Sequence, residues 1–223
     1  MLEPALRGRH TRGHGQFWSR GSYLEKGINQ RVVANSGKQR LLDAASELFA
    51  DYGVDEVTVA QILDVSGVKA PTLYHHFGGK EGLYVSWAVL TLGRIRHEVA
   101  EIEPNGQPLE RYLESVATCL LSNKGIDLSQ VLRDRSRLAS PESENQIERA
   151  IDSAIVKPLV RAISGTSQTA DPRCAAQLFL HLVTGSRGRY RLSGLERQPC
   201  IEAVVHLFLN GLRGEVAPKA LVD

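Results

Sequence analysis

Residues 58–77 read TVAQILDVSGVKAPTLYHHF, a stretch with the pattern of two short helices joined by a tight turn. Thr58 is followed three residues later by Gln61, which is the spacing of a capping box at a helix start. Gly67 can adopt the left-handed backbone conformation that reverses the chain at low cost. Pro71 fits in the first turn of a second helix, where its missing N–H is not needed. The stretch therefore predicts a helix-turn-helix.

The second of these helices is expected to have one buried and one exposed face. Leu73 and Phe77 are four residues apart, so they share a face, which we expect to point inward. The opposite face carries hydroxyl, phenol and imidazole groups, which can contact base edges and phosphates. The residues expected to face outward are Pro71, Thr72, Tyr74 and His75, with His76 at the flank.

Two short helices cannot bury a core alone, so a third helix is expected to pack across them. Apolar residues recur at helical spacing from Lys38 to Tyr52, and Gly53 follows as a C-terminal stop. Further helical patterns follow with few strand-like alternations, so we expect an all-α chain of roughly nine helices. The later segments are Lys80–Glu101, Pro108–Ser122, Asp127–Leu138, Glu142–Ile163 with a kink at Pro158, Asp171–Tyr190 and Pro199–Leu212.

The run from Gly67 to Phe77, followed by Lys80-Glu81 and Leu83, resembles the recognition segment of the TetR (tetracycline-repressor-like) family. Upstream, Ala44-Ala45 to Phe49, Gly53 and Thr58 also fall at that family's spacing. The resemblance covers about residues 36–85. It implies an N-terminal three-helix DNA-binding domain and a larger C-terminal helical domain for effector binding and dimerisation.

The resemblance also implies a set of DNA contacts. Thr58, at a helix N-terminus, would hold a phosphate. The residues placed in the major groove are Lys69, Ala70, Pro71, Thr72 and His75, and those placed on phosphates are Tyr74, His76 and Lys80. The alternative for each is an ordinary polar surface residue, and for His76 a partly buried packing role. Lys69 stands where family members often carry Ser, and Gly78-Gly79 offers only a weak cap before Lys80.

Charge is distributed unevenly along the chain. Residues 1–40 contain eight basic and two acidic residues, a balance of +6, whereas the remainder has a balance of −4. Residues 37–83 carry four basic and seven acidic residues, so the segment that contains the predicted helix-turn-helix is itself acidic. We therefore expect a basic disordered arm at 1–34, a DNA-binding domain at 35–95 and an effector-binding and dimerisation domain at 96–223. The arm has two alternatives: a solvated tail, or a segment beginning at an unnatural start.

These expectations describe a DNA-binding transcriptional regulator, specifically a repressor released from double-stranded operator DNA by a small-molecule effector. A homodimer would form through the last two helices, where an apolar stripe runs along Ile201–Leu212. The candidate effector residues are Tyr112, Arg133, Arg137, His181 and Tyr190. The alternative for these five is a solvated face. An alternative for the whole protein is an effector-independent architectural or division-linked DNA-binding protein.

Other classes of protein lack support in the sequence. No apolar run is long enough to span a membrane and no secretory signal is expected, so the predicted location is cytoplasmic. Cys119, Cys174 and Cys200 are widely spaced and match neither a disulfide framework nor a zinc site. No nucleophile elbow, phosphate loop or zinc-protease motif is present, and adjacent His75 and His76 point different ways on a helix. We expect no enzyme activity, no cofactor and no metal.

Overall fold

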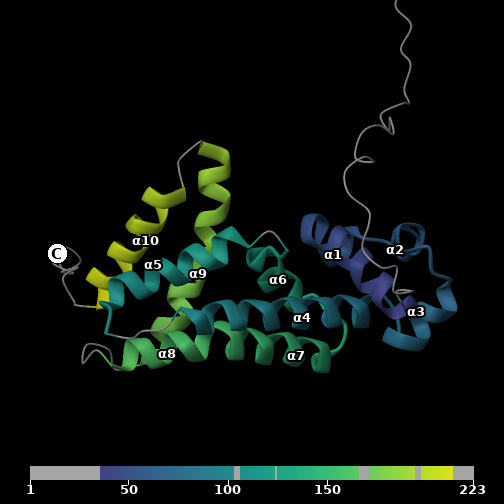
Figure 1. Ribbon diagram of the computed structural model, residues 1–223, viewed down its shortest axis with the longest axis horizontal. Helices are drawn as coiled ribbons and strands as arrows, with labels where there is room; N and C mark the ends of the chain where they lie inside the picture. Colours follow the sequence, from purple (N-terminus) through teal and green to yellow (C-terminus); the bar gives the residue numbers. More distant parts are fainter. Residues whose placement is uncertain (1–35, 103–105, 124, 166–170, 194–196, 213–223) are drawn as a thin grey trace, which may run out of the picture. The chain divides into compact units, whose positions relative to one another are not determined.

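The computed structural model describes residues 36–102, 106–123, 125–165, 171–193 and 197–212, and within these ranges every regular element is helical (Figure 1). The all-α prediction is therefore confirmed. The elements are α1 (Gly37–Glu56), α2 (Val59–Ser66), α3 (Ala70–Phe77), α4 (Lys80–Glu101), α5 (Leu109–Ser122), α6 (Leu128–Arg135), α7 (Pro141–Ile151), the π-helical η1 (Asp152–Val156), α8 (Lys157–Ser164), α9 (Pro172–Ser193) and α10 (Arg197–Leu212). The predicted arm, residues 1–34, lies outside the described residues.

The first three helices form a small head. Helix α1 packs against both α2 and α3, as the sequence predicts. The buried residues that hold the head together are Leu41, Ala45, Phe49, Ile62 and Leu73. Gly53 interrupts α1 with φ at 75°, so the last turn of that element has a different direction from the rest. This is the position at which the sequence predicts the helix to stop.

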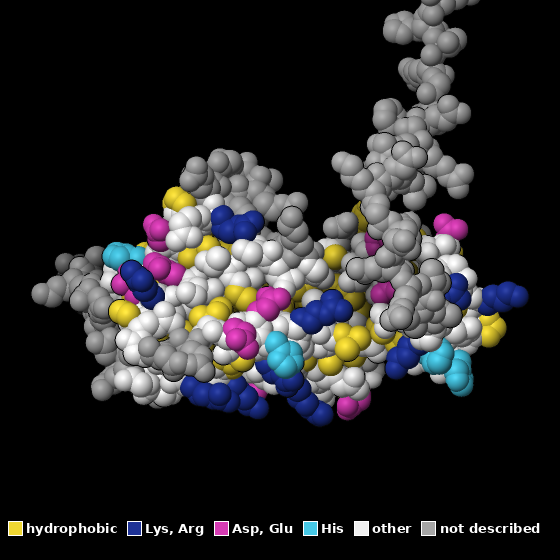
Figure 2. Space-filling view, viewed as in Figure 1, with side chains coloured by type: hydrophobic (Ala, Val, Ile, Leu, Met, Phe, Trp, Pro, Cys, Tyr) yellow, Lys and Arg dark blue, Asp and Glu magenta, His cyan; other side chains and the backbone are white. Residues whose placement is uncertain are grey.

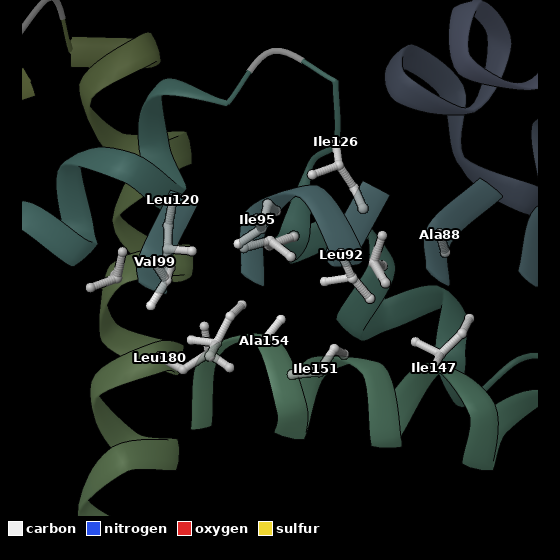
Figure 3. Packing of buried hydrophobic residues seen from close by; sticks show 14 of the residues in the cluster. Ala88, Leu92, Ile95, Val99, Leu120, Ile126, Ile147, Ile151, Ala154 and Leu180 are labelled. Carbon is white, nitrogen blue, oxygen red and sulfur yellow. The ribbon is translucent and has the colours of Figure 1, made fainter. Parts of the chain in front are cut away.

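Helix α4 joins the head to the rest of the chain. It packs against α1 and α3 at its beginning and against α5, α7 and η1 further on. In Figure 3, Leu92 and Ile95 of α4 lie opposite Ile151 and Ala154, and all four side chains are buried. Burying a leucine or isoleucine side chain stabilises the fold by about 1.5–3 kcal/mol. Because α4 continues through residue 95, the domain boundary proposed there falls within a helix and not in a linker.

The segment predicted as one helix, Glu142–Ile163, differs from the prediction. Its irregularity is η1, which precedes the proline, and α8 then contains Pro158 in its first turn. Proline lacks the N–H that an α-helix needs and crowds the carbonyl four residues earlier, which here belongs to Ala154. The wider π turn accommodates both effects, and the Lys157 N–H bonds to the carbonyl of Asp152, five residues earlier. The irregularity expected at Pro158 is therefore a π turn that immediately precedes it.

Two other boundaries also differ from the prediction. Helix α6 ends at Arg135, because Arg137 and Leu138 donate to carbonyls only three residues earlier and so tighten the chain into a turn. Helix α9 continues to Ser193, beyond the expected end at residue 190. The stripe on α10 faces its own chain: Ile201, Val205 and Phe208 are buried, and the Phe208 ring lies 5.0 Å from that of Phe179 on α9.

Candidate nucleic-acid interface

The turn between α2 and α3 has the predicted geometry. The Thr58 hydroxyl accepts from the Gln61 N–H at 3.2 Å, and the Thr58 N–H donates to the Gln61 side chain at 2.8 Å. This completes the capping box and satisfies two amides that α2 would otherwise leave without a partner. Gly67 ends α2 in the left-handed conformation, with φ at 60° and ψ at 26°. The capping box and the turn glycine are both confirmed.

Helix α3 presents a polar face to solvent. Leu73 is fully buried and Phe77 is half-buried, so these two anchor the helix to the head. Pro71, Tyr74 and both histidines are exposed, and Thr72 is half-buried. His76 is exposed and its ring lies 5.0 Å from that of His75, which does not favour the packing role that the sequence left open.

The start of α3 has no side-chain cap. Lys69 occupies the cap position without a capping hydrogen bond and is exposed, and Ala70 after it is half-buried. The cap of α4 at Gly79 likewise has no side-chain hydrogen bond. The starts of α3 and α4 therefore both leave backbone N–H groups without a side-chain cap, and such N–H groups can bind an anion.

Lys80 has a structural partner that the sequence did not predict. Its ammonium group donates to the carbonyl of Val54, at the end of α1, with an Nζ–O distance of 2.7 Å. Next to it, the carboxylate of Glu81 accepts from the backbone N–H groups of Ala139 and Ser140 at 2.9 and 3.2 Å. The side-chain bond to Ser143 and these backbone bonds lower the pKa of Glu81 and outweigh its desolvation, which alone would raise it. The start of α4 is thus bound to the head on one side and to the α6–α7 connection on the other.

The beginning of α1 lies against the turn and against α3. A Cβ atom placed on Gly67 would lie 3.9 Å from a guanidinium nitrogen of Arg40, and one on Gly37 would lie 3.0 Å from the Thr72 methyl group. Arg40 and Lys38 are exposed. Arg40 therefore adds a cation beside the turn that is not among the DNA contacts predicted from the sequence. The sequence did hold a clue to this position, because Arg40 lies in the first turn of the helix that was expected to pack across the other two.

A buried carboxylate connects the head to α6. Asp134 is completely buried, and its Oδ2 accepts from the Val54 N–H and from the Tyr84 hydroxyl, each at 3.0 Å. Its Oδ1 accepts from the side-chain amide of Gln130 at 2.6 Å. Burial, together with the negative charge of Asp134, raises the pKa of Tyr84, so the phenol stays protonated and remains a donor. Sequence reasoning missed this cluster, because its members are far apart in the chain.

Of the five residues suggested as an effector site, the four whose side chains are described are not brought together. Arg133 is exposed and bonds to Gln130, and Arg137 pairs with Asp55 of the head at 3.4 Å. His181 is exposed on α9, and the side chain of Tyr190 lies outside the described residues. Tyr112 is buried and lines a cavity of about 670 Å³ between α4, α5, η1 and α8, to which Arg133, Arg137 and His181 do not contribute.

The described residues offer little support for other chemistry. Within them no group of three or more His, Cys, Asp or Glu side chains is placed to hold a metal ion. The Cys119 thiol lies 3.4 Å from a carboxylate oxygen of Glu98, and burial together with this carboxylate raises the pKa of Cys119 to about 12. Such a thiol stays protonated and is a poor nucleophile. No helix in the described part of the chain is both long and apolar enough to cross a membrane.

A capped first helix, a left-handed turn and a second helix with an exposed polar face define a helix-turn-helix DNA-binding protein. Residues 41–86 match the family described as "Bacterial regulatory proteins, tetR family". The chain is a member of this TetR family of transcriptional regulators, as the sequence resemblance indicated.

Two curated proteins and one solved structure illustrate the relationship. The chain is 26% identical over 151 residues to the transcriptional repressor AcnR of Corynebacterium efficiens, which covers 66% of this chain and 78% of AcnR. It is 35% identical over 95 residues to the repressor KstR2 of Rhodococcus jostii, covering 42% of this chain and 46% of KstR2. A transcriptional regulator from Rhodococcus sp. Rha1 has the same fold, with a TM-score of 0.63 at 20% identity over 81% of this chain and 99% of the other.

Proposed function

We propose that this regulator is a repressor that binds operator DNA as a homodimer in the cytoplasm and leaves it when a small molecule binds. The observation that carries the DNA-binding part is the exposed polar face of α3, held on a head with its own buried core residues. Repression is supported by the curated relatives AcnR and KstR2, both named as transcriptional repressors. The proposal assigns the chain no catalytic role.

The proposed contacts divide into two kinds. Base edges in the major groove would meet Lys69, Ala70, Pro71, Thr72 and His75, and phosphates would meet Thr58, Tyr74, His76 and Lys80. Arg40 joins the second group because its guanidinium lies beside the turn. Since Lys80 also bonds to Val54, its ammonium would have to serve a phosphate and a carbonyl together, which its three N–H donors allow.

Dimerisation is supported by apolar side chains that α9 and α10 leave uncovered. Leu178 and Leu182 are one turn apart on α9 and are 57% and 45% exposed, and Leu207 on α10 is 66% exposed. Large leucines on two neighbouring helices suit a four-helix interface with the same two helices of a second chain. Two reading heads would then double the few positive contacts that an acidic head can make. A monomer in sedimentation at micromolar concentration would contradict this interface.

Release by an effector is supported by the rigid connections between the head and the larger helical part. Glu81 and Asp134 hold α1 and α4 to the α6–α7 region through hydrogen bonds and not through apolar contact alone. A ligand that displaced α6 or α7 would therefore also shift the head. Specific DNA binding that no small molecule affects would instead favour the architectural or division-linked alternative.

The test is to select an operator from random double-stranded DNA and to compare two tyrosine variants on it. Tyr74 on α3 is 55% exposed and Tyr52 on α1 is 53% exposed, so they form a matched pair. Tyr74→Ala should weaken operator binding by about tenfold, because it removes a phosphate hydrogen bond and ring contact. Tyr52→Ala should leave binding unchanged. Equal losses of operator affinity from the two substitutions would exclude α3 as the DNA-recognition helix.

A further inference from the structure

The cavity beside Tyr112 lies at the end of α4 that is remote in sequence from the head. Its walls come from the last turns of α4, the first turn of α5, η1 and the start of α8. At about 670 Å³ it falls in the size range of pockets that hold small organic molecules. It is also a place where the helix is locally irregular, since Ser153 in its wall belongs to the π-helical segment. Such segments recur at binding sites.

Positive charge gathers around this cavity. Lys157 and Arg161 are four residues apart on α8, so their side chains share a face, and Arg96 faces them from α4. Lys157 pairs with Asp152 at 3.3 Å, but no carboxylate partner is found for Arg96 or Arg161 among the described residues. Figure 2 shows Lys and Arg side chains along the edge of the molecule where α8 lies in Figure 1. Two guanidinium groups are therefore left to meet an anion.

Tyr112 contributes a polar atom that the protein itself does not use. The side chain is only 3% exposed and lines the cavity, yet its hydroxyl forms no hydrogen bond with any other described residue. Burial raises the pKa of Tyr112 and the positive charge of Arg161 partly opposes this, so the phenol is protonated and lies within the influence of the guanidinium. The hydroxyl is therefore free to donate a hydrogen bond to a ligand atom in the cavity.

Besides the exposed His97, the rest of the wall is apolar and made of Val99, Ala100, Ile102 and Pro158. A small inorganic ion would leave this surface in contact with water, whereas a neutral apolar molecule would leave the cations without partners. The lining therefore suits a ligand with two parts, an apolar body and one anionic group.

We propose that this cavity binds an organic anion, whose carboxylate, sulfonate or phosphate group lies between Arg96 and Arg161 and accepts a hydrogen bond from Tyr112. Guanidinium groups bind these oxyanions with paired, charge-assisted hydrogen bonds. The use of the site to release operator DNA rests on the proposed function, but anion binding does not.

The experiment measures binding of the fluorescent probe anilinonaphthalene sulfonate to the full chain, followed by competition with decanoate and with its uncharged analogue decanol. Decanoate should displace the probe at about tenfold lower concentration than decanol. Arg161→Gln should weaken probe binding by about tenfold, and Arg161→Lys should restore most of it. Tyr112→Phe should weaken binding by a smaller factor. Arg149→Gln, at an exposed arginine of α7 outside the cavity lining, should have no effect.

Thermal unfolding of each variant shows whether it is folded. If the Arg161→Gln variant does not fold, the Arg161→Lys variant still tests the proposal. Equal competition by decanoate and decanol, or equal losses from the Arg161→Gln and Arg149→Gln changes, would overturn the proposal. The same ligands are then added to the protein–operator complex. Decanoate that binds at the cavity without releasing operator DNA would leave the anion site standing and contradict effector release alone.

Discussion

Oδ2 of Asp134 lies 3.0 Å from the backbone nitrogen of Val54, a residue 80 positions earlier, and accepts its hydrogen bond. The same oxygen accepts from the Tyr84 hydroxyl, and the carboxylate is completely buried. A buried carboxylate is tolerated only when donors replace the water it has lost, and here three donors do so. Asp134 therefore joins α1, α4 and α6 at one point.

Replacing Asp134 by alanine should lower the free energy of unfolding by about 2–4 kcal/mol, because it leaves the Val54 N–H and the Tyr84 hydroxyl buried without an acceptor. Urea unfolding followed by circular dichroism measures this. Asp64→Ala, at an exposed position of α2, is the control and should change stability by less than about 0.5 kcal/mol. A small effect at Asp134 would mean that water replaces the carboxylate.

Gly53→Ala should also be destabilising, by more than about 1 kcal/mol, since φ there is positive. A Cβ atom at this position would also lie 2.5 Å from the side-chain nitrogen of Gln130, so that side chain would have to shift. Gly93→Ala is the opposite case, because it is helical and a Cβ atom there meets nothing within 4 Å. It should raise stability by about 0.5–1 kcal/mol. The two midpoints of urea unfolding should thus move in opposite directions.

Thr58→Ala removes the hydroxyl that caps α2 and should cost about 1 kcal/mol of stability. Thr58→Ser keeps the hydroxyl and should remain within a few tenths of a kcal/mol of the parent. Under the proposed function, only the alanine variant also loses operator affinity, since the serine still reaches a phosphate. Fluorescence anisotropy with labelled operator separates the two effects, and a serine variant as weak as the alanine one would argue against the cap.

Stability should fall as the pH rises above about 9, the ordinary pKa of a thiol, towards the value of about 12 that Cys119 has in the folded chain. In this window the unfolded chain releases the thiol proton and the folded chain retains it, so rising pH favours unfolding. Cys119→Ala should flatten the dependence between pH 9 and 10, because parent and variant share the same tyrosine titrations and differ only in this thiol. Unfolding midpoints at closely spaced pH values test this, and parallel curves for parent and variant would contradict it.

Deleting residues 1–34 should weaken operator binding and flatten its dependence on salt. The segment is rich in arginine, and each phosphate contact that it makes would add about 0.9 to the slope of log K against log salt concentration. The slope is measured from titrations at several salt concentrations. Replacing Arg7, Arg9 and Arg12 by Gln in the full chain separates the effect of charge from that of length. An unchanged slope in both proteins would exclude a contribution of the arm to DNA binding.

Local signals explain what the sequence predicted well. The capping box at Thr58, the turn at Gly67 and the proline at residue 71 each act within a few residues, so the helix-turn-helix could be predicted closely. The sequence indicated an irregularity near Pro158 but not its form, because the crowding that a proline causes is accommodated in the preceding turn, here as a π turn.

The interactions between distant elements could not be predicted in this way. Asp134 looks like any charged residue of an amphipathic helix, and only the folded chain shows that it faces Val54 and Tyr84. Arg133 and Arg137 were proposed as ligand contacts from their helix, yet Arg137 pairs with Asp55 and Arg133 with Gln130. The cations of the cavity, Arg96 and Arg161, lie on helices far apart in sequence, and no local pattern unites them.

Both polar groups of the Val54 backbone are engaged from outside the head, the N–H by Asp134 and the carbonyl by Lys80. Because these bonds use main-chain atoms, they depend on where the backbone of residue 54 lies and not on which side chain it carries. Anyone building chimaeric regulators, with the head of one protein on the sensor of another, should therefore transplant the head together with Lys80 and a matching Asp134. A junction placed between α3 and α4 would separate Val54 from both Lys80 and Asp134, and both hydrogen bonds to its backbone would then depend on the other protein.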